Sequence, residues 1–267
     1  MIELCVTSGA HPVEVDVSPV DGGRLARLAV GGRDLLVTGD SADDPMHWGS
    51  YPMVPFAGRL GAGRFEVEGR TVQLPCNLPP HAIHGTGFTS RWDVLDAGLD
   101  HAELSVALDW PLGGSAHQHV QLTADALVCV LTVVAGDRTM PVTLGWHPWF
   151  LKPDADRFAF GSMYERGSDY LPTGRLVPPG ARPWDDCFVA PAAPPELRYA
   201  PTASLPGVVV TVDSDCDHWV VYDQPAHATC VEPQSGPPDA VHLGAATMLA
   251  PGGMLQRTMT IRWSITG

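Results

Sequence analysis

The sequence predicts an all-β protein, either an antiparallel sandwich or a barrel, with enough strands for two broad sheets. Short segments that alternate apolar and polar residues, or are rich in β-branched residues, recur at roughly 8–15-residue spacing. Turn sequences such as VGGRD, EGR and APGGM separate them, and the 28 glycines and 26 prolines suit a loop-rich β protein. No window of about 12 residues or more shows the 3.6-residue period of an amphipathic helix.

Each expected strand carries one of these patterns and ends at a turn sequence. The strands are expected at 13–17, 24–30, 64–69, 71–74, 103–110, 119–136, 141–146, 207–213, 218–223 and 257–265. The Pro-rich segment 151–206 is interpreted as long loops that cover a sheet, because the strand patterns before and after it are alike. We therefore expect residues 1–267 to form a single domain.

Composition excludes several classes of function. The 267 residues carry a formal net charge of −14, with no basic stripe for a nucleic acid. No apolar run is long enough to span a membrane, and the first residues lack the pattern of a secretory signal, so a cytoplasmic protein is expected. Lys152 is the single lysine, so Schiff-base catalysis has one candidate residue. The six cysteines are scattered without a CxxC pair, which favours reduced, mostly buried thiols over a disulfide frame or a zinc site.

A histidine among tryptophans, in LGWHPWFLKP (144–153), is the first candidate for chemistry. Because His147 precedes Pro148, it is expected in extended backbone, with Gly145 and Trp149 on the same face. Trp149 would then offer a flat ring on which a sugar can stack. The alternative is a core histidine whose ring nitrogens are satisfied within the protein.

A glutamate in an otherwise apolar segment, CVEPQSGPPDAVH (230–242), is the second candidate. Glu232 precedes Pro233 and should also be extended, with Cys230 and Gln234 on its face. Partial burial would raise its pKa towards the range of a general base. A structural ion pair with an arginine explains the same pattern equally well.

Two further clusters carry polar groups next to glycine-rich turns. Arg59 lies in PFAGRLGAGRF (55–65), where a guanidinium suits sugar hydroxyls or a carboxylate, or a buried bridge to an acidic neighbour. His81 and His84 lie in HAIHGTGF (81–88), and loops of this kind often carry functional groups. Among the histidines to which no role is assigned, His81 is the one that we expect to line a pocket.

Taken together, the four clusters resemble the aldose 1-epimerase family, including its galactose mutarotase members. The order matches: an arginine in a PFA-x-R segment, a His-Gly turn, a His-Pro-aromatic-Phe segment, and a late Glu before an Asp-Ala pair. The opening GGRLARLAVGGRDLLV and the closing APGGMLQRTMTIRW also resemble that family, so the likeness spans nearly the whole chain.

The resemblance implies a β-supersandwich of large antiparallel sheets and the reversible ring opening of a pyranose. It implies His147 as general acid on the ring oxygen and Glu232 as general base on the anomeric hydroxyl. Arg59 and His84 would orient the sugar, and Asp185 in DDCF (185–188) would contact its hydroxyls. Neither a metal nor another cofactor is expected. The expected partner is a small sugar, with no nucleic acid or membrane, and the protein is expected as a monomer or homodimer.

This chain departs from the family pattern at Gly58, at Asp186, at His242 and after Phe150, which leaves the substrate open. One alternative is a hexose-6-phosphate 1-epimerase, for which Arg64 and Arg91 are the nearby cations. Another is a non-catalytic carbohydrate-binding domain on the same fold. The third is a metal-dependent, cupin-like enzyme with His117 and His119 on one strand face.

Overall fold

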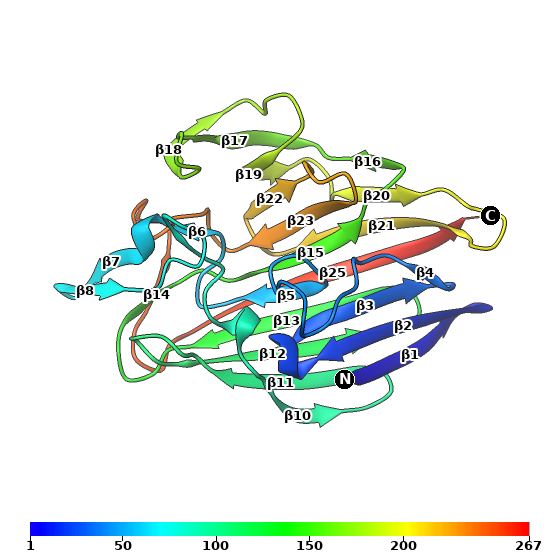
Figure 1. The fold of residues 1–267 in the computed structure, drawn as a ribbon, viewed down its shortest axis with the longest axis horizontal. Helices are drawn as coiled ribbons and strands as arrows, with labels where there is room; N and C mark the ends of the chain where they lie inside the picture. Colours follow the sequence, from blue (N-terminus) through cyan, green and yellow to red (C-terminus); the bar gives the residue numbers. More distant parts are fainter. Residues whose placement is uncertain (267) are drawn as a thin grey trace.

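Two large antiparallel β-sheets make up most of the computed structural model, which describes residues 1–266 (Figure 1). The 11-stranded sheet has the order β1-β2-β3-β5-β15-β23-β22-β19-β17-β18, with β4 paired to β3. Its strands are β1 (Ile2–Ser8), β2 (His11–Ser18), β3 (Arg24–Val30), β4 (Arg33–Asp34), β5 (Ser50–Met53), β15 (Gly145–Leu151), β17 (Phe160–Arg166), β18 (Pro172–Val177), β19 (Asp185–Pro191), β22 (His218–Tyr222) and β23 (Ala228–Gln234).

The 8-stranded sheet has the order β10-β11-β12-β13-β25-β21-β20-β16. Its strands are β10 (Asp93–Ala97), β11 (His101–Ala107), β12 (Ser115–Leu122), β13 (Ala126–Val134), β16 (Ala155–Arg157), β20 (Glu196–Tyr199), β21 (Gly207–Ser214) and β25 (Met254–Thr266). Three small pairs complete the strands: β6 (Arg59–Leu60) with β9 (Ala82–Ile83), β7 (Arg64–Val67) with β8 (Arg70–Gln73), and β14 (Met140–Val142) with β24 (Thr247–Leu249). The helical elements of residues 1–266 are short 3-10 turns, η1 (Pro19–Asp21), η2 (Gly61–Gly63) and η3 (Gly87–Thr89), and none of them is long enough to cross a bilayer.

The apolar core lies between the two large sheets, because alternate residues of each strand point inward. On β15, Trp146 and Phe150 point into this core and are fully buried. The indole Nε1 of Trp146 donates to Oε1 of Gln118 on β12 (3.2 Å), and the Gln118 amide donates to the Gly23 carbonyl (2.6 Å). Gly145, His147 and Trp149, which alternate with them along β15, therefore belong to the opposite, outer face of the 11-stranded sheet.

The prediction of an all-β fold with two broad sheets is confirmed, and β3 has the predicted bounds. Segment 119–136 contains a turn at 123–125 between β12 and β13, and 141–146 is divided between β14 and β15. The interpretation of 151–206 as loops is wrong: it contains β16, β17, β18, β19 and β20. These strands lie towards the ends of both sheets, where partial exposure and many prolines weaken the apolar alternation. All six thiols are free, and four of them are buried, as expected.

A buried arginine fixes the loop that precedes β5. Arg24 on β3 is fully buried, and its guanidinium donates to the carbonyls of Asp21 (2.6 Å), Pro45 (3.0 Å), Trp48 (2.9 Å) and Phe88 (3.2 Å). The guanidinium also lies 4.1 Å from the ring centre of Trp48. These contacts hold loop 40–49 and η3 against the edge of the outer face.

Replacing this arginine should destabilise the fold. We expect Arg24→Met to lower the free energy of unfolding by about 3 kcal/mol or more, because buried carbonyls lose their donors. Urea unfolding followed by tryptophan fluorescence measures it. Arg27→Met is the matched control on the same strand, since Arg27 pairs with Glu14 and Asp34 at the surface and should contribute less than about 1 kcal/mol. Equal effects of the two substitutions would contradict the assigned role of Arg24.

Candidate active site

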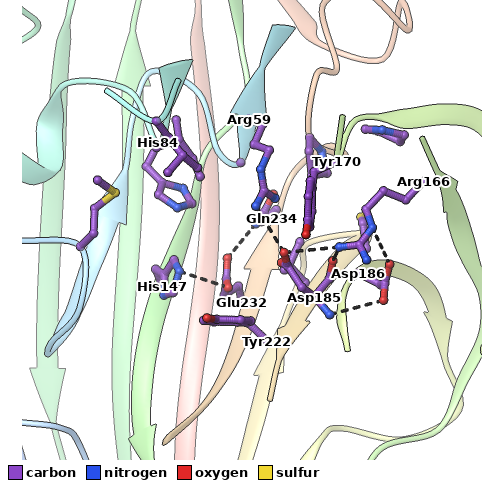
Figure 2. A pocket seen from close by; sticks show the side chains of 18 of the residues that line it. Arg59, His84, His147, Arg166, Tyr170, Asp185, Asp186, Tyr222, Glu232 and Gln234 are labelled. Carbon is purple, nitrogen blue, oxygen red and sulfur yellow. Dashed lines mark hydrogen bonds and ion pairs between the residues drawn. The ribbon is translucent and has the colours of Figure 1, made fainter. Parts of the chain in front are cut away.

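Strand register brings an imidazole and a carboxyl together on the outer face of the 11-stranded sheet. β15 and β23 are antiparallel neighbours, with Gly145 opposite Gln234 and Trp149 opposite Cys230. Counting between these pairs places His147 opposite Glu232. The Nε2 atom of His147 lies 3.2 Å from Oε1 of Glu232 (Figure 2).

Prolines interrupt the backbone ladder at this point. Pro148 follows His147 and Pro233 follows Glu232. Residues 146–148 of β15 are not paired with β23, although the residues on either side of them are. Proline has no N–H to donate to a ladder. On its other side His147 remains paired with Tyr51 of β5, whose ring stacks on the imidazole at 4.9 Å. The expected extended geometry of His147 and Glu232 is confirmed.

The two groups lie in a cavity of about 340 Å³, at the lower end of the range of about 300–1,000 Å³ for small-molecule sites. Side chains from β15, β23, β22, β19 and β17 form its floor, in that order across the sheet. The loops around β6 and β9 form its roof. From this roof Arg59, Ile83 and His84 face the floor.

Burial controls the protonation of the pair, because His147 is 6% and Glu232 2% exposed. Loss of solvent lowers the pKa of His147 from 6.5 to about 3. Burial raises the pKa of Glu232 well above 4.5, and the negative charge of Asp185 adds to this rise. A hydrogen bond from Nε2 of Gln234 to Oε2 of Glu232 (3.1 Å) and the charge of Arg59 oppose it. Burial therefore favours a neutral imidazole beside a protonated carboxyl, a state in which the pair holds one proton. The raised pKa of Glu232 agrees with the direction expected from the sequence.

His84 is held above His147 by an unusual backbone conformation. Its φ is +61°, and its N–H donates to the carbonyl of Gly58 (3.0 Å). Its ring meets the His147 ring edge-on, with the centroids 5.0 Å apart. Burial lowers the pKa of His84 well below 6.5, and the nearby His147 and Arg59 lower it further. The Nδ1 atom of His84 is buried and has no hydrogen-bond partner among residues 1–266, while other atoms of the residue line the cavity.

A network of two arginines and two aspartates lies at the other end of the cavity (Figure 2). Asp185 Oδ2 is 3.3 Å from Nη2 of Arg59 and 3.4 Å from Nη1 of Arg166, and Nε of Arg166 is 3.4 Å from Oδ1 of Asp186. The ring of Tyr170 lies near both guanidinium groups, at 5.1 Å from Arg59 and 4.5 Å from Arg166. We call Arg59, Arg166, Asp185 and Asp186 the Arg–Asp network. Its charges largely cancel, and its remaining donors and acceptors suit sugar hydroxyls.

Most of the predicted site residues lie together. His147, Glu232, Arg59, His84, Asp185 and Trp149 all line the cavity. Trp149 does not provide the expected stacking platform, because its indole lies between the imidazoles of His147 and His227. The interplanar angles are 11° with His147 and 10° with His227. Strand alternation imposes the first of these contacts.

His81 is outside the cavity lining, contrary to expectation. Its Nδ1 accepts a hydrogen bond from the N–H of Ala62 (3.2 Å), and its Nε2 lies 2.9 Å from the carbonyl oxygen of Asp169. Both ring nitrogens are therefore engaged by the backbone. The residue fixes two loops, one of them next to Tyr170.

Sequence reasoning missed Arg166, Tyr170 and Tyr222. Arg166 and Tyr170 lie within 151–206, which had been interpreted as loops. Tyr222 ends a strand that was predicted, and the alternation from His218 could have placed it on the outer face.

The residues on which the alternative hypotheses depend lie outside the cavity lining. Lys152 Nζ donates to the carbonyls of Asp223, Pro225 and Ala228. Arg64 and Arg91 are exposed and outside the cavity lining. His117 and His119 belong to no cluster of three potential metal ligands in residues 1–266.

Comparison with known proteins agrees with the geometry. Residues 5–262 match the family described as aldose 1-epimerase. A crystal structure from Escherichia coli K12 with the provisional description of an aldose 1-epimerase has a TM-score of 0.81 and 21% identity, and covers 98% of this chain and 99% of that one. A galactose mutarotase-like protein from Clostridium acetobutylicum gives a TM-score of 0.80 at 17% identity, covering 98% and 97%. At these identities the likeness shows the fold.

A curated relative is more similar in sequence over a shorter stretch. The uncharacterized protein YphB of Escherichia coli K12 is 36% identical over 123 residues, which is 43% of this chain. The match spans 41% of that protein's length.

Proposed function

This chain belongs to the aldose 1-epimerase family, and we propose that it interconverts the α and β anomers of a hexose that carries no phosphate. The observation that carries the proposal is the 3.2 Å contact between His147 and Glu232 inside a cavity of about 340 Å³. An imidazole and a carboxyl that share one proton are the two groups that opening a hemiacetal ring requires.

The reaction needs one proton to leave the sugar and one to reach it. The Glu232 carboxylate accepts the proton of the C1 hydroxyl while Nε2 of His147 donates a proton to the ring oxygen. The C1–O5 bond breaks and C1 becomes an aldehyde. Rotation about C1–C2 turns the other face of the aldehyde to the C5 hydroxyl, and closure by the reverse proton transfers gives the opposite anomer.

This mechanism requires the shared proton on His147 when the sugar is bound. Burial in the empty cavity favours a neutral imidazole with a protonated carboxyl. The Gln234 amide and the positive charge of Arg59 both lower the pKa of Glu232. A sugar hydroxyl on the carboxylate adds a further donor. We therefore propose that sugar binding moves the proton across the 3.2 Å contact to His147.

The order of the strands supports one direction for the bound sugar. With O5 at His147 and the C1 hydroxyl at Glu232, C2 and C3 extend over β22 and β19 towards Asp185 and the Arg–Asp network. C5 and C6 extend the other way, past β15. There the cavity is lined by Met46 and by His47, whose Nδ1 is 3.0 Å from Asp44.

A free hexose fits this direction better than a hexose 6-phosphate. Both arginines that line the cavity, Arg59 and Arg166, lie at the C2–C3 end, and carboxylates already pair with them. A phosphate dianion at C6 would meet no arginine or lysine of the described cavity lining. A non-catalytic sugar-binding domain would have no use for a buried pair aligned in this way.

Removing either member of the pair should nearly abolish catalysis. We expect Glu232→Gln and His147→Asn each to lower kcat by about 10²–10⁴-fold, since each removes one proton-transfer group. NMR exchange between the anomers of galactose and glucose measures the rates. The matched control is a second His–Glu pair, His119 and Glu103 on the 8-stranded sheet, 3.4 Å apart. Glu103→Gln and His119→Asn should leave kcat unchanged, and wild-type rates in the Glu232→Gln variant would refute the proposal.

The dependence of kcat/KM on pH should follow the shared proton. A second proton binds as pH falls through the lowered pKa of His147, and the last proton leaves as pH rises through the raised pKa of Glu232. Activity should therefore be flat around neutrality and fall on both sides. Asp185→Asn removes a charge that raises the pKa of Glu232, so it should move the basic limb to lower pH. Asp186→Asn should move it less, and a limb that does not respond to Asp185→Asn would contradict this account.

Discrimination against phosphate follows from the position of the arginines. We expect kcat/KM for galactose 6-phosphate and glucose 6-phosphate to be at least about tenfold below that of the free sugars, the equivalent of about 1.4 kcal/mol. Anomer exchange measured by NMR compares the four substrates directly. Faster exchange of the phosphates would favour the hexose-6-phosphate alternative.

A further inference from the structure

A thiol lies beside the proton-transfer pair and takes no part in the proposed reaction. One ligand atom from each of His147, Cys230 and Glu232 lies within 4.8 Å of the other two, and all three residues are buried. We propose that these residues form an inhibitory site for a thiolate-preferring divalent cation such as Zn²⁺. The inhibitory effect rests on the proposed function, whereas binding of the metal does not.

The donor set suits zinc. Imidazole nitrogen, thiolate sulfur and carboxylate oxygen are its usual ligands, and three protein ligands with one open position are a common arrangement. His147 and Glu232 line the cavity, so a fourth ligand can reach the metal from there. Mg²⁺ and Ca²⁺ prefer oxygen ligands and should not bind.

The strands hold the three ligands in place without a metal. Cys230 lies opposite Trp149 in the ladder and two residues before Glu232, so its side chain is on the same face of β23. The Gln234 amide engages Oε2 of Glu232, which leaves Oε1 directed at His147. Zinc bonds of about 2.0–2.3 Å would draw the three atoms, which now lie within 4.8 Å of one another, closer together around the ion.

Charge also favours a divalent ion here. A thiolate and a carboxylate carry two negative charges, which Zn²⁺ cancels in a site where an unpaired charge is costly. Burial raises the pKa of Cys230 well above 9.0, and Glu232 adds to that rise, so the free thiol is protonated. Binding must displace protons and should weaken as pH falls. A bound ion would occupy the groups that act on C1 and O5, and the sugar reaction would stop.

Cadmium is the direct probe of binding, because a cadmium–thiolate bond absorbs in the ultraviolet. Cys5 is exposed and Cys76 half-buried, so both are first replaced by serine to remove their signal. In this background we expect one equivalent of Cd²⁺ to produce the absorption and Cys230→Ser to abolish it. Cys187→Ser is the matched control: it removes another buried thiol, one that lines the cavity but is outside the cluster, and should leave the absorption intact.

Inhibition is then measured by anomer exchange. Zn²⁺ should inhibit reversibly, with EDTA restoring the rate and Mg²⁺ having no effect. The inhibition of each protein is expressed relative to its own rate without zinc. On this scale Cys230→Ser should raise the half-inhibiting Zn²⁺ concentration at least about tenfold over that of the parent, as expected for loss of a ligand. Cys230→Ala serves as a second variant if the serine protein does not fold.

The two proposals fail in different ways. Absence of a Cys230-dependent absorption, or equal zinc sensitivity of the Cys230 variants and the parent, would overturn the metal site. Absorption without any anomer exchange in the metal-free protein would instead overturn the proposed function.

Discussion

The contact between His147 and Glu232 depends on one register, that of β15 against β23. Because side chains alternate along a strand, that register also decides which β15 residues enter the core. Trp146 points inward and bonds to Gln118 of the opposite sheet, and this fixes His147 outward. A slip by one residue would bury the imidazole between the sheets and expose the indole. Core packing and site geometry are therefore set by the same constraint.

Burial then gives the pair its chemistry. A buried charge without solvent is costly, so burial lowers the pKa of His147, raises that of Glu232 and favours the state in which the pair holds one proton. The surrounding charges adjust this state in opposite directions, with Asp185 raising the pKa of Glu232 and Arg59 lowering it. The same burial raises the pKa of the neighbouring Cys230 thiol well above 9.0. The Arg–Asp network offers donors and acceptors for the hydroxyls of the proposed sugar without adding net charge to the cavity.

Much of this arrangement could be predicted from the sequence. The two X-Pro positions indicated extended backbone at His147 and Glu232, and the resemblance to a family assigned Arg59, His84 and Asp185 to the same site. Arg166 and Tyr170 could not be found, because their strands and turns are partly exposed and Pro-rich, so the alternation is weak there. The roles expected for His81 and Trp149 were wrong. Strand alternation predicts which face a side chain is on, but it does not show that backbone groups engage both nitrogens of His81 or that two imidazoles lie against the ring of Trp149.

The most direct measurement is a crystal structure of the Glu232→Gln protein soaked with galactose or glucose. The account predicts the ring oxygen within hydrogen-bond distance of Nε2 of His147 and the anomeric hydroxyl at the side-chain amide of residue 232. It also predicts C2 and C3 directed towards Asp185. A sugar bound with its anomeric carbon turned away from both residues, or bound outside the cavity, would contradict it.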